Sequence, residues 1–152
     1  MIDRKVKSAR VRVGGLVIED GRLLLIAHRK GKRVYWLLPG GGVDFGESLE
    51  EALERELKEE LGIAVSVKDI AFVSDSIDPG SKRHIINICF HCRCKKGGVS
   101  LGTEKRLHDF GFFTPHQLRS LVLYPPVKKE LGRLLAGSRR ARIYLGKQWM
   151  NP

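Results

Sequence analysis

The apolar positions near the start of the chain fall into short runs that predict strands. Apolar residues dominate 11–18 and 22–28, and Asp20-Gly21, a pair typical of hairpin turns, separates the two runs. The charged stretch 28–33 that follows is predicted to be a loop. A third apolar run, at 34–38, predicts a further strand that leads directly into a row of glycines.

The apolar spacing changes to that of a helix after residue 48. Ser48, followed three residues later by Glu51, forms a capping box, so a helix is expected to begin at Leu49. Gly62 is a natural residue for its C-terminal cap. Apolar side chains recur at helical spacing between these ends and define one buried face: Leu49, Ala52, Leu53, Leu57 and Leu61.

Three glutamates of this helix depart from the amphipathic pattern. At about 100° per residue, Glu56 and Glu60 fall within the apolar face, and Glu59 falls at its edge. Carboxylates turned toward the interior are costly unless a cation lies among them, and Arg55 alone cannot neutralise three. A hard divalent cation such as Mg²⁺ could do so, because it takes oxygen ligands and keeps several waters.

A simpler interpretation is that the glutamates only make the helix soluble. Pairs four residues apart, such as Glu51 and Arg55, would then stabilise its exposed face. This interpretation explains the residues that point outward. It does not explain Glu56 and Glu60, where the residue type conflicts with the expected burial, and such conflicts tend to mark functional sites.

The rest of the chain alternates between predicted strands and short helices. Strands are expected at 64–74 and 82–94, joined by a link at 75–81 that contains the turn sequence Asp-Pro-Gly-Ser. Thr114 is expected to cap a helix that has Pro115 at its first position. The remaining predicted elements are a strand at 110–113, a helix at 127–135 and an edge strand at 142–145.

Composition limits the class of protein. The chain has 152 residues, of which 42% are hydrophobic and 30% charged, and this balance predicts one globular domain over residues 1–152. No stretch is long and apolar enough to span a membrane, and the N-terminal residues lack the apolar segment of a signal peptide. A cytoplasmic location is therefore expected.

The formal net charge of +11 suits a polyanionic ligand and makes contact with RNA or DNA possible. Much of this charge lies near the two ends of the chain, where basic residues more often increase solubility, so nucleic-acid binding is not favoured.

Cys89, Cys92 and Cys94 lie in one predicted strand without a matching second pair, so they are interpreted as packing residues and not as a zinc site. Cys92 and Cys94 are expected on one face of the strand and Cys89 on the other.

The glycines before the helix complete a recognisable motif. Consecutive glycines at 40–42 let the backbone approach a ligand closely, and beside a helix with inward-facing carboxylates they indicate a site for metal and phosphate. Residues 41–63 resemble the Nudix box, the 23-residue signature of the Nudix hydrolase family, at all nine of its fixed positions. The matching residues are Gly41, Glu47, Arg55, Glu56, Leu57, Glu59, Glu60, Gly62 and Ile63.

The resemblance implies an α/β (α+β) fold, in which a mixed sheet is sandwiched between helices as α/β/α. It also implies hydrolysis of a diphosphate bond in a nucleoside diphosphate linked to another group, with Mg²⁺ or Mn²⁺ as cofactor. Arg55 would orient the carboxylates, and Glu47 would pair with Arg55. The metal ligands that the resemblance suggests are the Gly40 carbonyl, Glu56, Glu59 and Glu60.

The resemblance leaves the general base open. One of the glutamates of the box, Glu104 or Asp109 would take the proton from the attacking water. Family members often carry a further acidic residue before the strand predicted at 110–113. Gly111 occupies a place where a carboxylate would be expected.

The substrate is suggested only by weaker signals. Pro79 lies sixteen residues beyond Ile63 and is similar in position to a proline of ADP-ribose pyrophosphatases, which favours ADP-ribose or a related nucleotide sugar. The alternatives are a (d)NTP, a dinucleoside polyphosphate or, less favoured, RNA whose 5′ end is processed. A homodimer is possible, as in many relatives. The candidate substrate contacts are Arg29, Trp36 or its neighbour Tyr35, Gly41 and Pro79.

Overall fold

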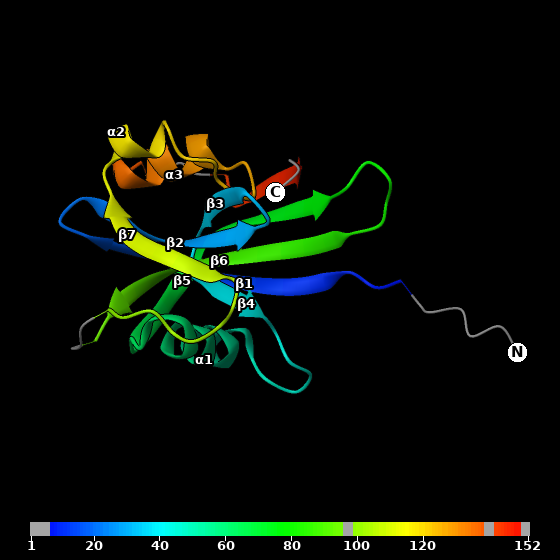
Figure 1. Ribbon diagram of the computed structural model, residues 1–152, viewed down its shortest axis with the longest axis horizontal. Coiled ribbons are helices and arrows are strands. Elements are labelled where there is room, and N and C mark those ends of the chain that lie inside the picture. Colours follow the sequence, from blue (N-terminus) through cyan, green and yellow to red (C-terminus); the bar gives the residue numbers. More distant parts are fainter. Residues whose placement is uncertain (1–6, 96–98, 139–141, 150–152) are drawn as a thin grey trace, which may run out of the picture.

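The computed structural model describes residues 7–95, 99–138 and 142–149 (Figure 1). The elements, in chain order, are β1 (Arg10–Glu19), β2 (Arg22–Lys30), β3 (Arg33–Leu37), β4 (Gly40–Gly42), α1 (Leu49–Leu61), β5 (Val65–Ile77), β6 (His84–Cys94), β7 (Leu107–Phe113), α2 (Pro115–Leu118), α3 (Lys128–Leu135) and β8 (Tyr144–Gln148).

The strands form one mixed sheet in the order β3-β2-β1-β6-β5-β8, with β4 paired to β1 and β7 paired to β2. The β1–β6 and β5–β8 pairs are parallel, and the other pairs are antiparallel. The far end of β1 pairs with β2, whereas its first half pairs with β4 through Arg12, Val13 and Gly14. This second pairing holds the glycine strand β4 beside the start of β1.

Helices cover both faces of the sheet, with α1 on one side and α2 and α3 on the other (Figure 1). Each face has its own apolar core. Leu53 and Leu57 of α1 pack in a cluster with Val13 and Phe90, and a second cluster joins Phe72 to the side chains of α2 and α3. The predicted α/β/α sandwich with a mixed sheet is therefore confirmed.

The helix α1 has the ends that its sequence predicts. The Ser48 hydroxyl accepts a hydrogen bond from the backbone N–H of Glu51, whose carboxylate accepts one from the backbone N–H of Ser48. Gly62 closes the helix in the left-handed conformation with φ of 65°. The predicted apolar face is buried except at Leu49, which is half-buried, and Glu60 is buried with it, at 3% exposure.

Two segments predicted as connections are partly strand. The charged stretch 28–33 is a tight hairpin, because β2 continues to Lys30, which pairs with Arg33 at the start of β3. Long charged side chains can extend into solvent from such an exposed end, so their charge does not interrupt the backbone pairing. Residues 75–77 of the predicted link also continue β5, where they pair with β6.

The remaining predicted elements are present with shifted ends. β7 begins three residues earlier than predicted, α3 begins one residue later, and β8 occupies 144–148 as an edge strand beside β5. Thr114 caps α2 as predicted.

The cysteines are free thiols, with Cys89 in one core cluster and Cys92 and Cys94 packed against the other. In the described part of the chain, no helix is long and apolar enough to cross a membrane.

Candidate active site

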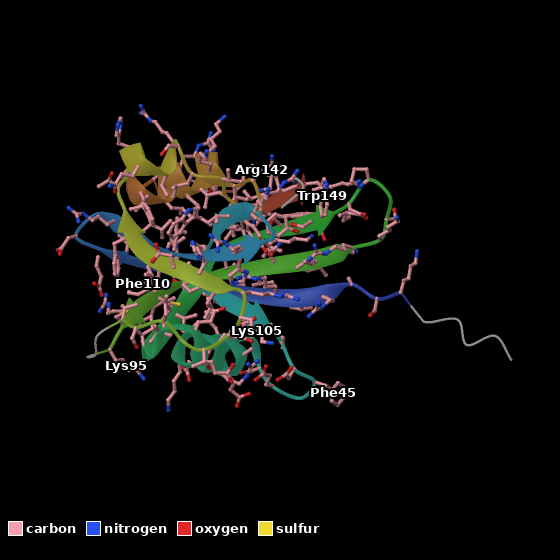
Figure 2. The ribbon with its side chains drawn as sticks, viewed as in Figure 1. Phe45, Lys95, Lys105, Phe110, Arg142 and Trp149 are labelled. Atoms are coloured by element: carbon pink, nitrogen blue, oxygen red, sulfur yellow. The ribbon has the colours of Figure 1, made fainter. Side chains whose placement is uncertain are left out.

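A cavity of about 300 Å³ lies where β4, α1 and the first half of β1 meet. The segment that carries Glu104 and Arg106, marked by Lys105 in Figure 2, also contributes to its wall. Besides glycines and aliphatic residues, three kinds of functional side chain line the cavity. They are the carboxylates Glu56, Glu59, Glu60 and Glu104, the guanidinium groups of Arg10, Arg12, Arg83 and Arg106, and the rings of His28, Tyr35 and Tyr124.

The glycine strand β4 is fitted closely to its neighbours. The Gly40 N–H donates a hydrogen bond of 3.0 Å to Oε2 of Glu60. Gly40 has φ of 149°, and a Cβ atom there would overlap the backbone of Val13. A Cβ atom at Gly41 would overlap the carboxyl group of Glu56, so only glycine leaves that carboxylate its place. The glycines therefore let α1 approach β4 closely enough to share one site.

Arg55 joins the carboxylates of α1 to the loop before the helix. Its guanidinium donates to both carboxylate oxygens of Glu47, at 2.6 and 3.1 Å, and to the Gly42 carbonyl at 3.1 Å. The same group donates to Glu56 at 2.9 Å and to Glu59 at 3.4 Å. The expected pairing of Glu47 with Arg55 is present, and Arg55 orients two of the candidate metal ligands.

Replacing Arg55 by alanine is expected to lower the free energy of unfolding by about 1 to 2 kcal/mol, because several charge-assisted hydrogen bonds are lost in a partly exposed cluster that water screens. Urea unfolding monitored by circular dichroism measures this change. Arg55→Lys is the matched variant, since it keeps the charge but not the planar fork, and it is expected to recover only part of the loss. Full recovery by lysine would show that charge alone matters here.

Burial changes the protonation of the carboxylates in the metal-free protein. It raises the pKa of Glu60 to about 8, against the opposing effects of Arg12 and of the Gly40 N–H. Burial also raises the pKa of Glu56, which Arg55 partly offsets. Both carboxylates thus lie where a negative charge is poorly compensated by the protein alone.

This donor set fits a hard divalent cation. Carboxylate and carbonyl oxygens are the ligands that Mg²⁺ prefers, and a bound cation would favour the ionised form that burial disfavours. Within the described ranges, no three His, Cys, Asp or Glu side chains already converge on one point. The carboxylates are instead spread along the cavity, an arrangement that suits a cation which retains several of its waters.

The shifted pKa of Glu60 predicts how the stability of the metal-free protein depends on pH. Because the folded state binds the Glu60 proton more tightly than the unfolded state, stability should fall as pH rises from about 4.5 to about 8. The glutamine of the Glu60→Gln variant does not titrate. Over that range, the free energy of unfolding of the variant should therefore increase relative to that of the wild type as pH rises. Urea unfolding at a series of pH values in EDTA measures both curves, and parallel curves would contradict the assignment.

The structure brings together only part of the set proposed from sequence. Gly40, Gly41, Glu56, Glu59, Glu60 and Glu104 all line the cavity, and Arg55 touches the carboxylates. Asp109 does not line it, and its carboxylate accepts a hydrogen bond of 2.8 Å from the backbone N–H of Phe110. Of the two candidate bases outside the box, the structure therefore places Glu104 at the site.

Three of the proposed substrate contacts lie elsewhere. Arg29 is exposed and outside the cavity, while its neighbour His28 lines it, because successive residues of a strand face opposite sides. In the same way Trp36 packs against Phe113, with ring centroids 4.7 Å apart, and Tyr35 faces the cavity. Pro79 lies in the turn between β5 and β6, away from the cavity lining.

Sequence reasoning missed most of the cationic and aromatic wall. Arg10 and Arg12 belong to the basic N-terminal stretch, whose charge was expected to increase solubility, yet both line the cavity from β1. Tyr124 follows an ordinary loop, and it reaches the site because its backbone N–H donates to the Trp36 carbonyl and its ring packs against Tyr35. A signal was available for one residue, since strand alternation requires either His28 or Arg29 to face inward.

Comparison with known proteins decides the family. The family model described as the NUDIX domain matches residues 8–136. This chain belongs to the Nudix family. As a Nudix hydrolase, it carries the complete box on the β4–α1 segment described above, and its fold is that of the family.

Two curated relatives and one solved structure illustrate the similarity. The chain is 35% identical over 101 residues to an ADP-ribose pyrophosphatase of Methanocaldococcus jannaschii, a match over 66% of this chain and 60% of that relative. It is 30% identical over 126 residues to the nucleoside triphosphatase NudI of Escherichia fergusonii, over 76% of this chain and 89% of the relative. The crystal structure of a MutT NUDIX hydrolase from Burkholderia pseudomallei superposes with a TM-score of 0.73 at 31% identity, over 82% of this chain and 97% of that one.

Proposed function

We propose that this Nudix hydrolase cleaves the diphosphate bond of ADP-ribose or a related nucleotide sugar with the help of Mg²⁺ or Mn²⁺. One observation carries the proposal: a single cavity combines box carboxylates, four arginines and an aromatic wall. These are the groups that a divalent cation, a diphosphate and a nucleoside respectively require. The volume of about 300 Å³ lies at the lower end of the range for small-molecule sites.

The carboxylates would hold the cofactor. Glu56, Glu59 and Glu60, with the Gly40 carbonyl, would bind the cation, and Arg55 would keep Glu56 and Glu59 in position. When bound, the cation neutralises diphosphate charge and makes a coordinated water more acidic.

The other side chains of the cavity would bind the diphosphate and move the proton. The guanidinium groups of Arg10, Arg12 and Arg106 would bind phosphate oxygens, which they recognise better than lysines because of their planar fork. A water attacks one phosphorus, and the P–O bond to the bridging oxygen breaks, so that two phosphate monoesters leave. We propose Glu104 as the base that takes the proton of this water, because it lines the cavity and is near enough for its charge to raise the pKa of both Glu56 and Glu60.

The experiment that tests this function measures product release from a panel of substrates, with and without Mg²⁺. The panel contains ADP-ribose, nucleotide sugars, diadenosine polyphosphates, all (d)NTPs and capped RNA. We expect metal-dependent turnover of ADP-ribose to AMP and ribose 5-phosphate. Turnover of (d)NTPs alone would instead favour a nucleoside triphosphatase activity, the activity for which the NudI relatives are named.

A second function is supported by a separate observation. Arg83 lines both the main cavity and a smaller one of about 240 Å³, which also carries Lys7, Lys82 and His84. A longer polyanion, such as a dinucleoside polyphosphate or the 5′ end of RNA, could follow this basic path. Its test is RNA affinity at rising salt, where a steep decrease for the wild type and a shallower one for Lys82→Glu would support the second function.

A further inference from the structure

Four aromatic rings form a continuous series along one wall of the site. His28 contacts Tyr35 with ring centroids 5.7 Å apart, Tyr35 contacts Tyr124 at 6.1 Å, and Tyr124 contacts Trp149 at 6.3 Å. Each contact is edge-to-face, with angles of 73°, 73° and 87°, which is a favoured geometry for aromatic pairs. The first three rings line the cavity, and Trp149 ends the series through its contact with Tyr124.

Two polar atoms of this wall have no hydrogen-bond partner. In the described part of the chain, Nε2 of His28 and the hydroxyl of Tyr124 are buried without one, and both residues line the cavity. Buried polar atoms are nearly always paired in folded proteins, so an unpaired one beside a cavity indicates a missing ligand. The other unpaired atoms belong to Ser74, Asn87 and Glu130, which do not line the cavity.

The chemistry of the two groups defines what they can bind. Burial, together with Arg12 and Arg106, lowers the pKa of His28 to about 4, so its ring is neutral at pH 7 and offers one donor and one acceptor. The Tyr124 hydroxyl can also donate and accept. A planar ligand that packs against aromatic rings and has hydrogen-bond donors and acceptors on its edge can satisfy both groups, and a nucleobase has this chemistry.

We propose that His28 and Tyr124 bind the edge of the substrate's nucleobase, and that Trp149 positions Tyr124 for this role. The proposal rests on the proposed function for the phosphate end of the same cavity. It adds the residues that hold the other end of the substrate. The carboxylates and the aromatic wall would thus divide the cavity between the diphosphate and the base.

Trp149 belongs to a segment outside the family match, which ends at residue 136. The strand β8 brings it into place by pairing in parallel with β5, and Figure 2 labels Trp149 beside β8. Trp149 is not among the residues that line the cavity, so it would act only through its contact with Tyr124. This part of the base site would therefore be a feature of this chain and not of the family box.

The test measures binding of AMP and of ribose 5-phosphate to the metal-free protein by calorimetry. The two ligands share the sugar phosphate, so the ratio of their affinities reports on the base alone. We expect Tyr124→Phe and His28→Phe each to weaken AMP binding by about tenfold, the loss of one hydrogen bond, and to leave ribose 5-phosphate unchanged. Tyr144→Phe is the matched control, because its hydroxyl donates to Asp75 and lies outside the cavity.

Stability separates this role from a structural one. Tyr124→Phe removes a buried hydroxyl that has no partner, so its unfolding midpoint should equal or exceed that of the wild type while AMP binding falls. Trp149→Ala should lower the ratio of the affinity for AMP to the affinity for ribose 5-phosphate. Trp149→Phe should keep most of that ratio. A Trp36→Phe protein keeps Trp149 as its single tryptophan, and AMP, but not ribose 5-phosphate, should change the tryptophan emission.

Equal affinity of the wild type for AMP and ribose 5-phosphate would overturn the proposal, as would unchanged AMP binding by both His28→Phe and Tyr124→Phe. Neither outcome depends on catalysis. If no substrate of the panel is cleaved but AMP binding still requires His28 and Tyr124, the proposed hydrolysis fails and the base site stands. If ADP-ribose is cleaved and the two variants bind AMP normally, the base site fails and the hydrolysis stands.

Discussion

Glu60→Gln is expected to lower the proposed metal-dependent hydrolysis of ADP-ribose by about two to three orders of magnitude, which is the size of effect seen when a group that stabilises charge in the transition state is lost. Glu60 is 3% exposed and lines the cavity with Glu56. An anion from solvent therefore cannot take the place of its lost carboxylate charge. Glutamine has the same shape and can still accept the hydrogen bond from the Gly40 N–H. The fold should remain intact while the charge that a cation needs is lost.

Glu54→Gln is the matched control, because Glu54 lies on the exposed face of the same helix α1. Activity, Mn²⁺ affinity by calorimetry and the urea midpoint in EDTA should be measured for both variants. We expect Glu60→Gln alone to lose both activity and metal affinity, with an unchanged or higher midpoint. Near wild-type activity together with normal Mn²⁺ binding would exclude Glu60 as a metal ligand.

Gly41→Ala is expected to lower activity by about 100-fold with little effect on stability, which is the effect expected when a catalytic group moves out of position. The added Cβ would overlap the Glu56 carboxyl group. That group is the end of a flexible side chain, so it can rotate away at small cost to the fold. Its new position would no longer serve a cation shared with Glu60.

Gly42→Ala provides the comparison one residue further along β4. A Cβ atom there would meet only the Arg10 guanidinium, at 3.8 Å, which is an ordinary contact. This variant should retain most of the activity, and steady-state rates at saturating Mg²⁺ measure the difference. Equal losses in both variants would mean that the backbone of β4, and not the position of Glu56, limits the reaction.

The helix that carries the box could be predicted closely because its signals are local. The capping box at Ser48, the terminal Gly62 and the apolar spacing depend only on residues within a few turns of one another. The burial of Glu60 followed from the same spacing. These features therefore needed no knowledge of the sheet.

The extents of the strands were harder to predict, because they depend on partners far away in the chain. Residues 75–77 look like part of a turn, yet they extend β5 because β6 lies alongside to accept the pairing. The charged segment 28–33 is a hairpin for a similar reason, since β2 and β3 pair up to Lys30 and Arg33. Local charge and turn propensity were overridden by backbone pairing.

The sequence by itself determined the family, the carboxylate helix and the glycine strand that faces it. Spacing along one short segment was sufficient, because all of these residues lie within 40–63. Only the tertiary structure decided which residues complete the cavity. Arg12, His28, Glu104 and Tyr124 come from separate segments of the chain. The pairing of β1 with β4, the hydrogen bond from the Gly102 N–H to the Glu60 carbonyl and the packing of Tyr124 on Tyr35 bring these segments together. Because side chains alternate along a strand, one of two adjacent residues, such as His28 and Arg29, must face the cavity. Only the assembled sheet shows which of the two does so.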